Sequence, residues 1–174
     1  MTDKIPFMLA KEMTKGMPAP RSDPECQPPV DWEASEKYDG YRGQWVKVNG
    51  EWMFLSRAQK PFIGTPDWYK LALPDVNLDG ELWVGRENFE SMGVVRKHKP
   101  DPKEWIPVKF VVYDLPSVKK PFSERLKELR KVVKENKDRW DKVKKTLPEE
   151  FHIECPVKMA TQTTIKSVEH MEEL

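Results

Sequence analysis

The sequence predicts an α+β fold that is rich in antiparallel strands. Two apolar runs, 41–48 and 51–56, flank Asn49-Gly50, the dipeptide typical of a type I′ turn, and they predict a β-hairpin. Further along, a charged segment at 121–146 carries apolar residues near helical spacing and predicts one long helix. Strands and a helix that follow one another in this way, without βαβ alternation, favour α+β over a parallel sheet.

The remaining elements follow in chain order. Residues 7–13 predict a short helix or a first edge element, and a proline-rich connector follows, which we expect to be an extended segment or a disordered linker. Runs of apolar and β-branched residues predict strands at 76–84 and 108–113 and a shorter one near 151–155. The prolines of the connector are Pro18, Pro20, Pro24, Pro28 and Pro29.

The predicted long helix has a plausible start and a strong charge. Ser123 is the predicted N-cap, with Glu124 in the first turn. Between Ser117 and Thr146 the chain has twelve Lys/Arg and five Asp/Glu, a local charge of +7. Two interpretations stay open: the solvated face of an amphipathic helix, or a surface that contacts phosphates of a nucleic acid.

Composition indicates a globular protein with one hydrophobic core. The chain has 174 residues, 38% hydrophobic and 34% charged, and a net charge of only +1, so no global basic field indicates a nucleic-acid partner. No apolar run is long enough for a membrane span, and the N-terminus is not typical of a signal peptide. Cys26 and Cys155 are far apart and form no metal-ligand pattern. We therefore expect two free thiols in a reducing intracellular compartment: nuclear, cytoplasmic or a viral factory.

The run 35–42, Ser-Glu-Lys-Tyr-Asp-Gly-Tyr-Arg, is the main candidate for chemistry. It places Lys37 between the carboxylates of Glu36 and Asp39, with Gly40 allowing close approach of the backbone to a ligand. This arrangement suits a nucleophile that attacks a phosphate. Taken alone, however, the run favours a surface turn in which Asp-Gly supplies the bend.

Three further segments follow in order, and together with the run 35–42 they resemble one family. They are Ser56-Arg57, Asp79-Gly80-Glu81-Leu82 and Val112-Tyr113-Asp114. With Lys37-x-Asp-Gly-x-Arg42, they resemble motifs I, Ia, III and IIIa of the nucleotidyltransferase domain of ATP-dependent DNA ligases. That superfamily also includes RNA ligases and mRNA capping enzymes. The resemblance implies the antiparallel-rich, ATP-grasp-like fold of the ligase adenylation domain.

The resemblance also implies a reaction. Lys37 would attack the α-phosphate of ATP, release pyrophosphate and keep AMP as a phosphoramidate, with Mg²⁺ neutralising the triphosphate. Only a neutral amine can attack, whereas a free lysine titrates near ~10.4, so the site must promote deprotonation. Asp39 would orient the nucleophile or, later, the attacking hydroxyl. No residue is assigned as a metal ligand.

The other implied roles concern binding. Arg42 and Glu81 would hold the ribose hydroxyls, Tyr113 would stack on adenine, and the backbone of Glu36 would lie at the adenine edge. Arg57 would contact the 5′-phosphate of a nick. The implied partners are ATP and nicked duplex DNA.

Two of the family's motifs are missing from the sequence. Motif IV, Glu-Gly-x-x, does not occur, so no Lys-x-Lys stands after it as motif V, and we expect the OB-fold domain to be missing as well. We therefore expect an incomplete adenylation domain, with an N-terminal segment at 1–34 and motifs I, Ia, III and IIIa within 35–174. The tail from 165 to 174 resembles the helix that precedes motif IV. Such a chain is expected to adenylate itself weakly or not at all and not to seal nicks alone.

Three alternatives remain open at this stage. An RNA ligase or a capping guanylyltransferase would share the motifs but differ in substrate. A non-catalytic module that binds a nucleotide or a nucleic acid would keep the surface without the chemistry. An unrelated α+β domain would contain Asp-Gly twice by coincidence, which requires four ordered matches to be accidental.

Overall fold

The computed structural model describes residues 30–174, which belong to two compact units. The larger unit is Tyr38–Ala160, and the smaller one combines the chain up to Lys37 with Thr161–Leu174. The predictions for residues 7–13, for the proline-rich connector and for Cys26 lie outside the described residues. Among the described residues, no helix combines the length and apolar character needed to cross a bilayer.

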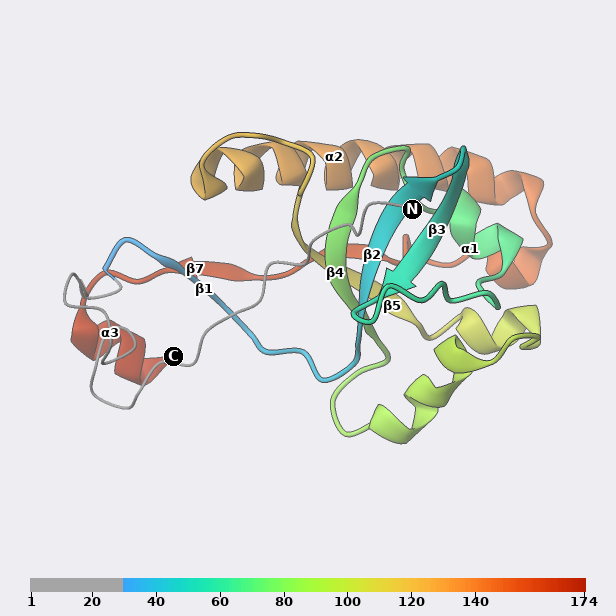
Figure 1. Cartoon of the computed structure of the whole chain (residues 1–174), viewed down its shortest axis with the longest axis horizontal. Helices are drawn as coiled ribbons and strands as arrows, with labels where there is room; N and C mark the ends of the chain where they lie inside the picture. Colours follow the sequence, from blue (N-terminus) through green and yellow to red (C-terminus); the bar gives the residue numbers. More distant parts are fainter. Residues whose placement is uncertain (1–29) are drawn as a thin grey trace. The chain divides into compact units, whose positions relative to one another are not determined.

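The larger unit is built on a five-stranded sheet with the order β3-β2-β4-β5-β6 (Figure 1). All neighbouring pairs are antiparallel except β5 and β6, which are parallel. The predicted antiparallel-rich α+β class is therefore confirmed. The strands are β2 (Tyr41–Val48), β3 (Glu51–Ser56), β4 (Leu78–Trp83), β5 (Lys109–Asp114) and β6 (Val157–Met159).

The predicted hairpin is confirmed residue by residue. β2 and β3 have the predicted bounds, and Val48 pairs with Glu51 across the turn. Asn49 and Gly50 both adopt positive φ, 50° and 84°, as a type I′ turn requires. An L-residue other than Asn or Asp is strained in this conformation, which explains why the dipeptide was informative.

The long helix is also present, but its start differs from the prediction. α2 spans Phe122–Val143 and begins after Pro121, without a side-chain cap, so the prediction of Ser123 as N-cap is wrong. Pro121 lies in the extended region at ψ 151°, and its carbonyl accepts from the N–H groups of Glu124 and Arg125. Proline fixes φ near the value that the start of a helix needs, so Ser123 falls inside the first turn.

The predicted strand near 151–155 is wrong. Pro148 starts a 3₁₀ turn, Glu149–Phe151, and β6 begins only after Pro156. A proline at each end removes the N–H groups that a ladder would use, which displaces the strand. The sequence pattern also missed α1 (Asp67–Leu71) and the longer 3₁₀ segments, which are Phe89–Arg96 and Pro102–Trp105.

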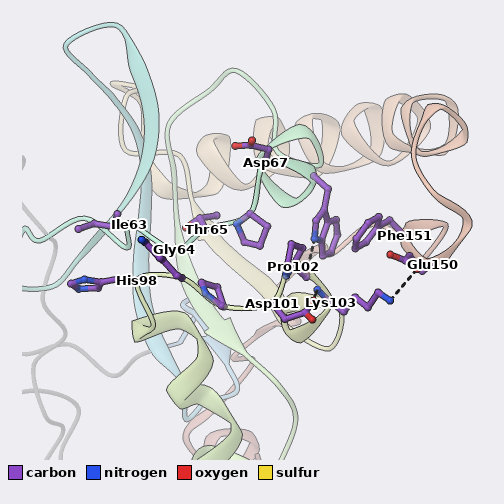
Figure 2. A pocket seen from close by; sticks show the side chains of 14 residues that line it. Ile63, Gly64, Thr65, Asp67, His98, Asp101, Pro102, Lys103, Glu150 and Phe151 are labelled. Atoms are coloured by element: carbon purple, nitrogen blue, oxygen red, sulfur yellow. Dashed lines mark hydrogen bonds and ion pairs between the residues drawn. The ribbon is translucent and has the colours of Figure 1, made fainter.

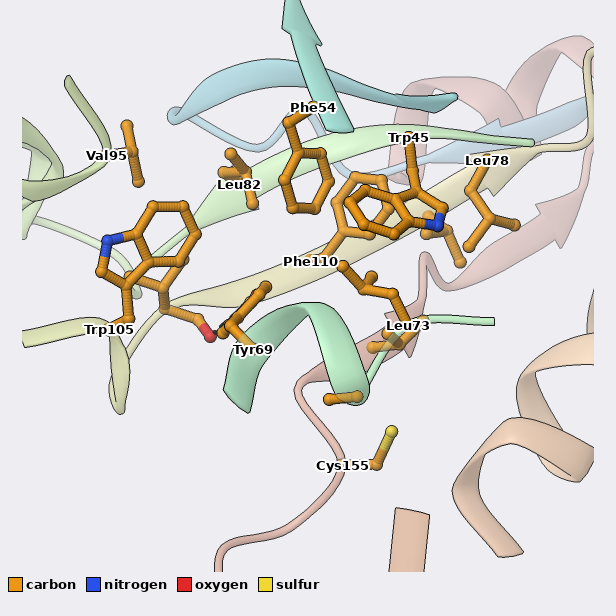
Figure 3. Close-up of a cluster of buried hydrophobic side chains, with 14 of the residues drawn as sticks. Trp45, Phe54, Tyr69, Leu73, Leu78, Leu82, Val95, Trp105, Phe110 and Cys155 are labelled. Atoms are coloured by element: carbon orange, nitrogen blue, oxygen red, sulfur yellow. Dashed lines mark hydrogen bonds between the residues drawn. The ribbon is translucent and has the colours of Figure 1, made fainter. Parts of the chain in front are cut away.

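The hydrophobic core covers one face of the sheet. Figure 3 shows Trp45, Phe54 and Phe110 projecting from three strands toward Tyr69 of α1. Phe110 packs edge-on against Phe54 with ring centroids 4.9 Å apart. From α2, Leu126, Leu129 and Trp140 join the same buried cluster, so the core lies between this helix and the sheet. Cys155 is a buried free thiol that packs there as a small hydrophobe, although not within a strand.

The smaller unit contains a two-stranded antiparallel sheet and one short helix. β1 (Glu33–Ser35) pairs with β7 (Gln162–Thr164), and the Thr164 hydroxyl donates to a Glu33 carboxylate oxygen at 2.9 Å. α3 (Val168–Glu173) follows, with the Ser167 hydroxyl accepting from the backbone N–H of His170. The helix expected in the tail is therefore present.

Candidate functional site

The face of the sheet opposite the core carries the polar residues of the predicted motifs. Side chains alternate along a strand, and Trp45 of β2 and Leu82 of β4 belong to the core. The residues that alternate with these core residues along β2 and β4 therefore point to the opposite face of the sheet. We call this surface the polar face and define it by Arg42, Gln44, Asp79, Glu81 and Tyr113.

A buried ion pair organises the polar face. Arg42 donates to both carboxylate oxygens of Asp79, with Nε–Oδ1 at 3.1 Å and Nη2–Oδ2 at 2.6 Å. The two side chains are only 18% and 2% exposed. Burial raises the pKa of Asp79 despite the opposing effect of Arg42. Burial also disfavours the charge of Arg42, but hydrogen bonding and attraction by Asp79 outweigh this effect, and the pKa of Arg42 is raised.

Glu81 lies directly opposite Arg42 across β2 and β4. Its Oε1 accepts from the backbone N–H of Gly40 at 3.2 Å. A Cβ on Gly40 would lie 2.0 Å from the carbonyl oxygen of Leu82, so only glycine lets the loop approach the strand this closely. The glycine of the Asp-Gly pair thus brings the loop against β4 and attaches it to the Glu81 carboxylate.

Tyr113 reaches the polar face through a β-bulge. Asp114 pairs with Asp79 and Val112 pairs with Gly80, so Tyr113 is the extra residue between them. The guanidinium carbon of Arg42 lies 5.7 Å from the centre of its ring. Burial, with help from the charge of Asp79, raises the pKa of Tyr113 far above the usual range of a phenol. The bulge re-aims a half-buried, neutral ring toward the Arg42 pair.

A second arginine–aspartate pair lies beside the first. Asp114 accepts from Nε of Arg125 at 2.8 Å and from its Nη2 at 3.2 Å. Asp114 is the cross-strand neighbour of Asp79, and its charge contributes to the raised pKa of Asp79. Since Arg125 belongs to the first turns of α2, this pair attaches the helix to the end of β5.

Two residues of the polar face were not singled out by sequence reasoning. Asp79 had been read only as part of a motif, although it holds Arg42. Gln44 is 1% exposed, and its Oε1 has no hydrogen-bond partner among the described residues. The alternation from Arg42 to Gln44 and from Glu81 back to Asp79 was the available signal, because it places all four on one face.

The structure therefore brings together Arg42, Glu81 and Tyr113 of the predicted site residues. Glu36, Lys37 and Asp39 are exposed. Lys37 is the residue at which the chain passes from the smaller unit to the larger one. The next residue, Tyr38, packs edge-on against Trp83 of β4, with ring centroids 5.3 Å apart.

Arg57 lies outside the polar face as defined. It is exposed and follows the end of β3 at Ser56, whose partner on β2 is Gly43. Ser56 itself closes a tight turn, in which its hydroxyl accepts from the N–H of Lys60 at 3.2 Å. Arg57 is thus presented by a turn beside the strand that carries Arg42.

One pocket of the larger unit lies away from the polar face. It has a volume of about 620 Å³ and lies between the loop before α1, the 98–103 segment and the 3₁₀ turn at Phe151 (Figure 2). Its walls are held by structural contacts: Trp68 Nε1 donates to the Pro102 carbonyl at 2.8 Å, and Lys103 pairs with Glu150 at 3.3 Å. None of the seven predicted site residues lines this pocket. Pocket size alone therefore does not locate the predicted chemistry.

The described residues contain no cluster of three or more His, Cys, Asp or Glu side chains that could hold a metal ion. A protein-only metal site is not formed by this part of the chain. Mg²⁺ bound with a nucleotide needs only one or two carboxylates, because phosphates and water supply the other ligands. The residue types near Lys37, with Glu36 and Asp39 exposed, fit that mode.

Comparison with known proteins agrees with the motif reading. The sequence model of the family described as ATP-dependent DNA ligase domain matches residues 8–174. A DNA ligase from Haemophilus influenzae is 33% identical over 105 residues, covering 60% of this chain and 37% of that protein. A solved structure from a structure–function study of Lig E DNA ligases, on DNA binding with a minimal scaffold, is 27% identical with a TM-score of 0.62.

The structural match covers 83% of this chain and 49% of the other, so the chain spans half or less of the length of either relative. The family match covers nearly all of the sequence, including every residue of the polar face. The chain belongs to the ATP-dependent DNA ligase domain family.

Proposed function

We propose that this chain provides the nucleotide-binding part of an ATP-dependent DNA ligase, in which Lys37 accepts AMP from ATP and nicked duplex DNA is the final substrate. The observation that carries the proposal is the convergence of Arg42, Glu81 and Tyr113. They come from three neighbouring strands and lie together on the one sheet face that the core leaves uncovered.

Each of these residues suits one part of the nucleotide. The Glu81 carboxylate accepts hydrogen bonds from ribose hydroxyls, and the Arg42 guanidinium donates them. The pair with Asp79, through Nε and Nη2, fixes the orientation of the Arg42 fork. The half-buried ring of Tyr113 stacks on adenine. The base-edge contact proposed for Glu36 uses its backbone.

The chemistry begins at Lys37. Its neutral Nζ attacks the α-phosphorus, the new P–N bond forms, and the bond to the leaving pyrophosphate breaks. The proton leaves the amine before or during attack, and Asp39, two residues away, orients the amine. When bound to the triphosphate, Mg²⁺ supplies charge neutralisation. Arg57 then contacts the 5′-phosphate of the nick, where a guanidinium fork matches a phosphate.

The decisive experiment follows covalent label. The protein is incubated with Mg²⁺ and either ATP or GTP labelled at the α-phosphate, and the adduct is tested for acid lability and for release by hydroxylamine. Label from ATP that is lost in Lys37→Ala supports the proposal, even at the low level expected of a chain without motifs IV and V. Lys47→Ala, which changes an exposed lysine of β2, is the matched control and keeps the label.

Other outcomes point elsewhere. Label that persists in Lys37→Ala excludes this lysine as the nucleophile. Label from GTP instead of ATP would indicate a capping-type enzyme. Equilibrium binding of ATP that is unchanged in Tyr113→Ala would contradict the proposed base stack.

A further inference from the structure

The outer side of α2 and the turn after it carry a row of exposed cations. We call this row the basic stripe. Its members are Lys127, Arg130, Lys131, Lys134, Lys142 and Lys145.

Helix geometry gathers these residues on one side. Leu126, Leu129 and Trp140 point into the core, and the stripe residues occupy the positions between them on the opposite side. From Lys127 to Lys145 the row extends about 27 Å at the helical rise per residue. Figure 1 shows α2 running alongside the sheet of the larger unit.

The charge is concentrated in this region of the chain. Ser117 to Thr146 carries +7, whereas the whole chain carries +1, so the rest of the protein carries −6. Such a separation of charge is not needed for solubility, which interspersed charges provide equally well. It indicates a partner that carries negative charge.

Three of the other cations of this segment have structural partners. Arg125 pairs with Asp114, and Arg139 donates to the carbonyls of Leu71 and Leu73 at 2.9 Å. Lys144 lies 2.8 Å from Asp141. All six stripe residues are exposed.

Acidic side chains interrupt the stripe only in part. Lys131 lies 3.8 Å from Glu135, a pair that is exposed on both sides and therefore weak. Asp138 is exposed within the row, and Asp141 is engaged by Lys144. The six cations outnumber these acids, so the row keeps a net positive charge.

The stripe and the polar face lie on opposite sides of the larger unit. The core lies between α2 and the sheet, and the polar face is the sheet surface that the core does not cover. A duplex that contacts the polar face therefore cannot, as a straight rod, also lie along the stripe. The two surfaces serve different stretches of nucleic acid or different molecules.

We propose that the basic stripe is a second duplex DNA-binding surface, independent of sequence and of a nick. B-DNA carries one negative charge per about 1.7 Å of axis, so a cationic row of about 27 Å faces a long series of phosphates and binds by releasing counterions. The absence of aromatic or amide side chains among the six stripe residues fits backbone contact without base readout. The inference concerns DNA binding alone and does not depend on Lys37 chemistry.

The test measures the affinity of the intact chain for an unnicked duplex of about 20 base pairs, by fluorescence anisotropy at several salt concentrations. The triple variant Lys127→Gln/Lys131→Gln/Lys134→Gln removes three stripe cations from the exposed side of the helix. Its matched control is Lys70→Gln/Lys97→Gln/Lys103→Gln. The control removes the same charge at lysines that are paired with Glu51, Glu104 and Glu150.

The stripe variant is expected to bind about tenfold more weakly at low salt and to flatten the log–log salt dependence by roughly 2–3. The control is expected to lose far less. Thermal unfolding of both variants establishes that they are folded.

Equal losses in the two variants would overturn the proposal, because net charge alone would then explain binding. Stripe-dependent binding to polyglutamate that is tighter than binding to the duplex would overturn it in favour of an acidic protein. Adenylation measured in parallel separates this result from the proposed function, since the stripe variant should label as the wild type does.

Discussion

The two faces of the five-stranded sheet differ in what their residues do. On the core face, Phe54, Leu82 and Phe110 fill space, and apolar neighbours of similar shape would satisfy them. On the polar face, Arg42 and Asp79 satisfy one another through two directed hydrogen bonds, and a change of one leaves the other buried without its partner. The same strands supply both faces because their side chains alternate. We infer that stability resides mainly on one face and specificity on the other.

The largest expected effect is on the core face. Phe110→Ala should lower the free energy of unfolding by about 3–5 kcal/mol, because the ring is fully buried and packs edge-on against Phe54. Urea denaturation measures this loss. Ile63→Ala, at a side chain that is 66% exposed, is the control and should change stability by less than about 0.5 kcal/mol. A similar loss at both positions would mean that the core has been wrongly located.

The two aspartates offer a sharper comparison. Asp79→Asn and Asp114→Asn each weaken a buried pair with an arginine, and each should cost roughly 2–4 kcal/mol of unfolding free energy. Only Asp79 holds Arg42, so only Asp79→Asn should also weaken ATP binding, by about tenfold. Titration calorimetry measures the affinity. If both variants weaken ATP binding equally, the role in ATP binding cannot be assigned to Asp79 rather than to Asp114.

Substitutions at two glycines distinguish a loss of stability caused by a steric clash from a loss of adenylation. A Cβ on Gly40 would lie 2.0 Å from the Leu82 carbonyl oxygen, and one on Gly64 would lie 2.0 Å from that of Lys97. Alanine at either position should cost roughly 1–3 kcal/mol of unfolding free energy. Only Gly40→Ala should reduce adenylation, since Gly40 donates to Glu81 and Gly64 lines the distant pocket. Equal loss of adenylation in both would point to general destabilisation.

The smallest expected effect is a pH dependence at Tyr113. Because burial raises its pKa, the folded protein keeps the phenol proton where the unfolded chain has lost it. The folded state therefore binds more protons above about pH 10, and the free energy of unfolding falls as pH rises. Tyr113→Phe removes this contribution, so wild type should lose stability relative to the variant as pH rises above about 10. If the free energy of unfolding depends on pH in the same way in both proteins, the Tyr113 hydroxyl is exposed to water and burial does not raise its pKa.

Local sequence signals predicted the parts of the fold that local physics controls. Asn49-Gly50 determined the hairpin, because few dipeptides adopt positive φ twice without strain. The 3.6-residue period of Leu126, Leu129 and Trp140 determined the long helix. The errors occurred where proline set the backbone. Pro121 displaced the expected cap, and Pro148 and Pro156 displaced the last strand.

For the site, the motif order predicted Arg42, Glu81 and Tyr113, and the structure brings these three residues together. The motif order did not predict that Asp79 would hold Arg42 or that Gln44 would be buried beside Asp79. Strand pairing decides both, since residues 37 positions apart become neighbours only when β2 and β4 align in one register.

The sequence by itself determined the family and the residue types available for chemistry, because the order and spacing of the motifs are properties of the chain alone. Tertiary structure alone decided which of these groups meet. The bulge at Tyr113 and the antiparallel register of β2 with β4 turn separate motifs into one surface. Long-range pairing of this kind depends on the burial of the whole core and not on any local pattern, which is the reason that sequence could name these residues but not arrange them.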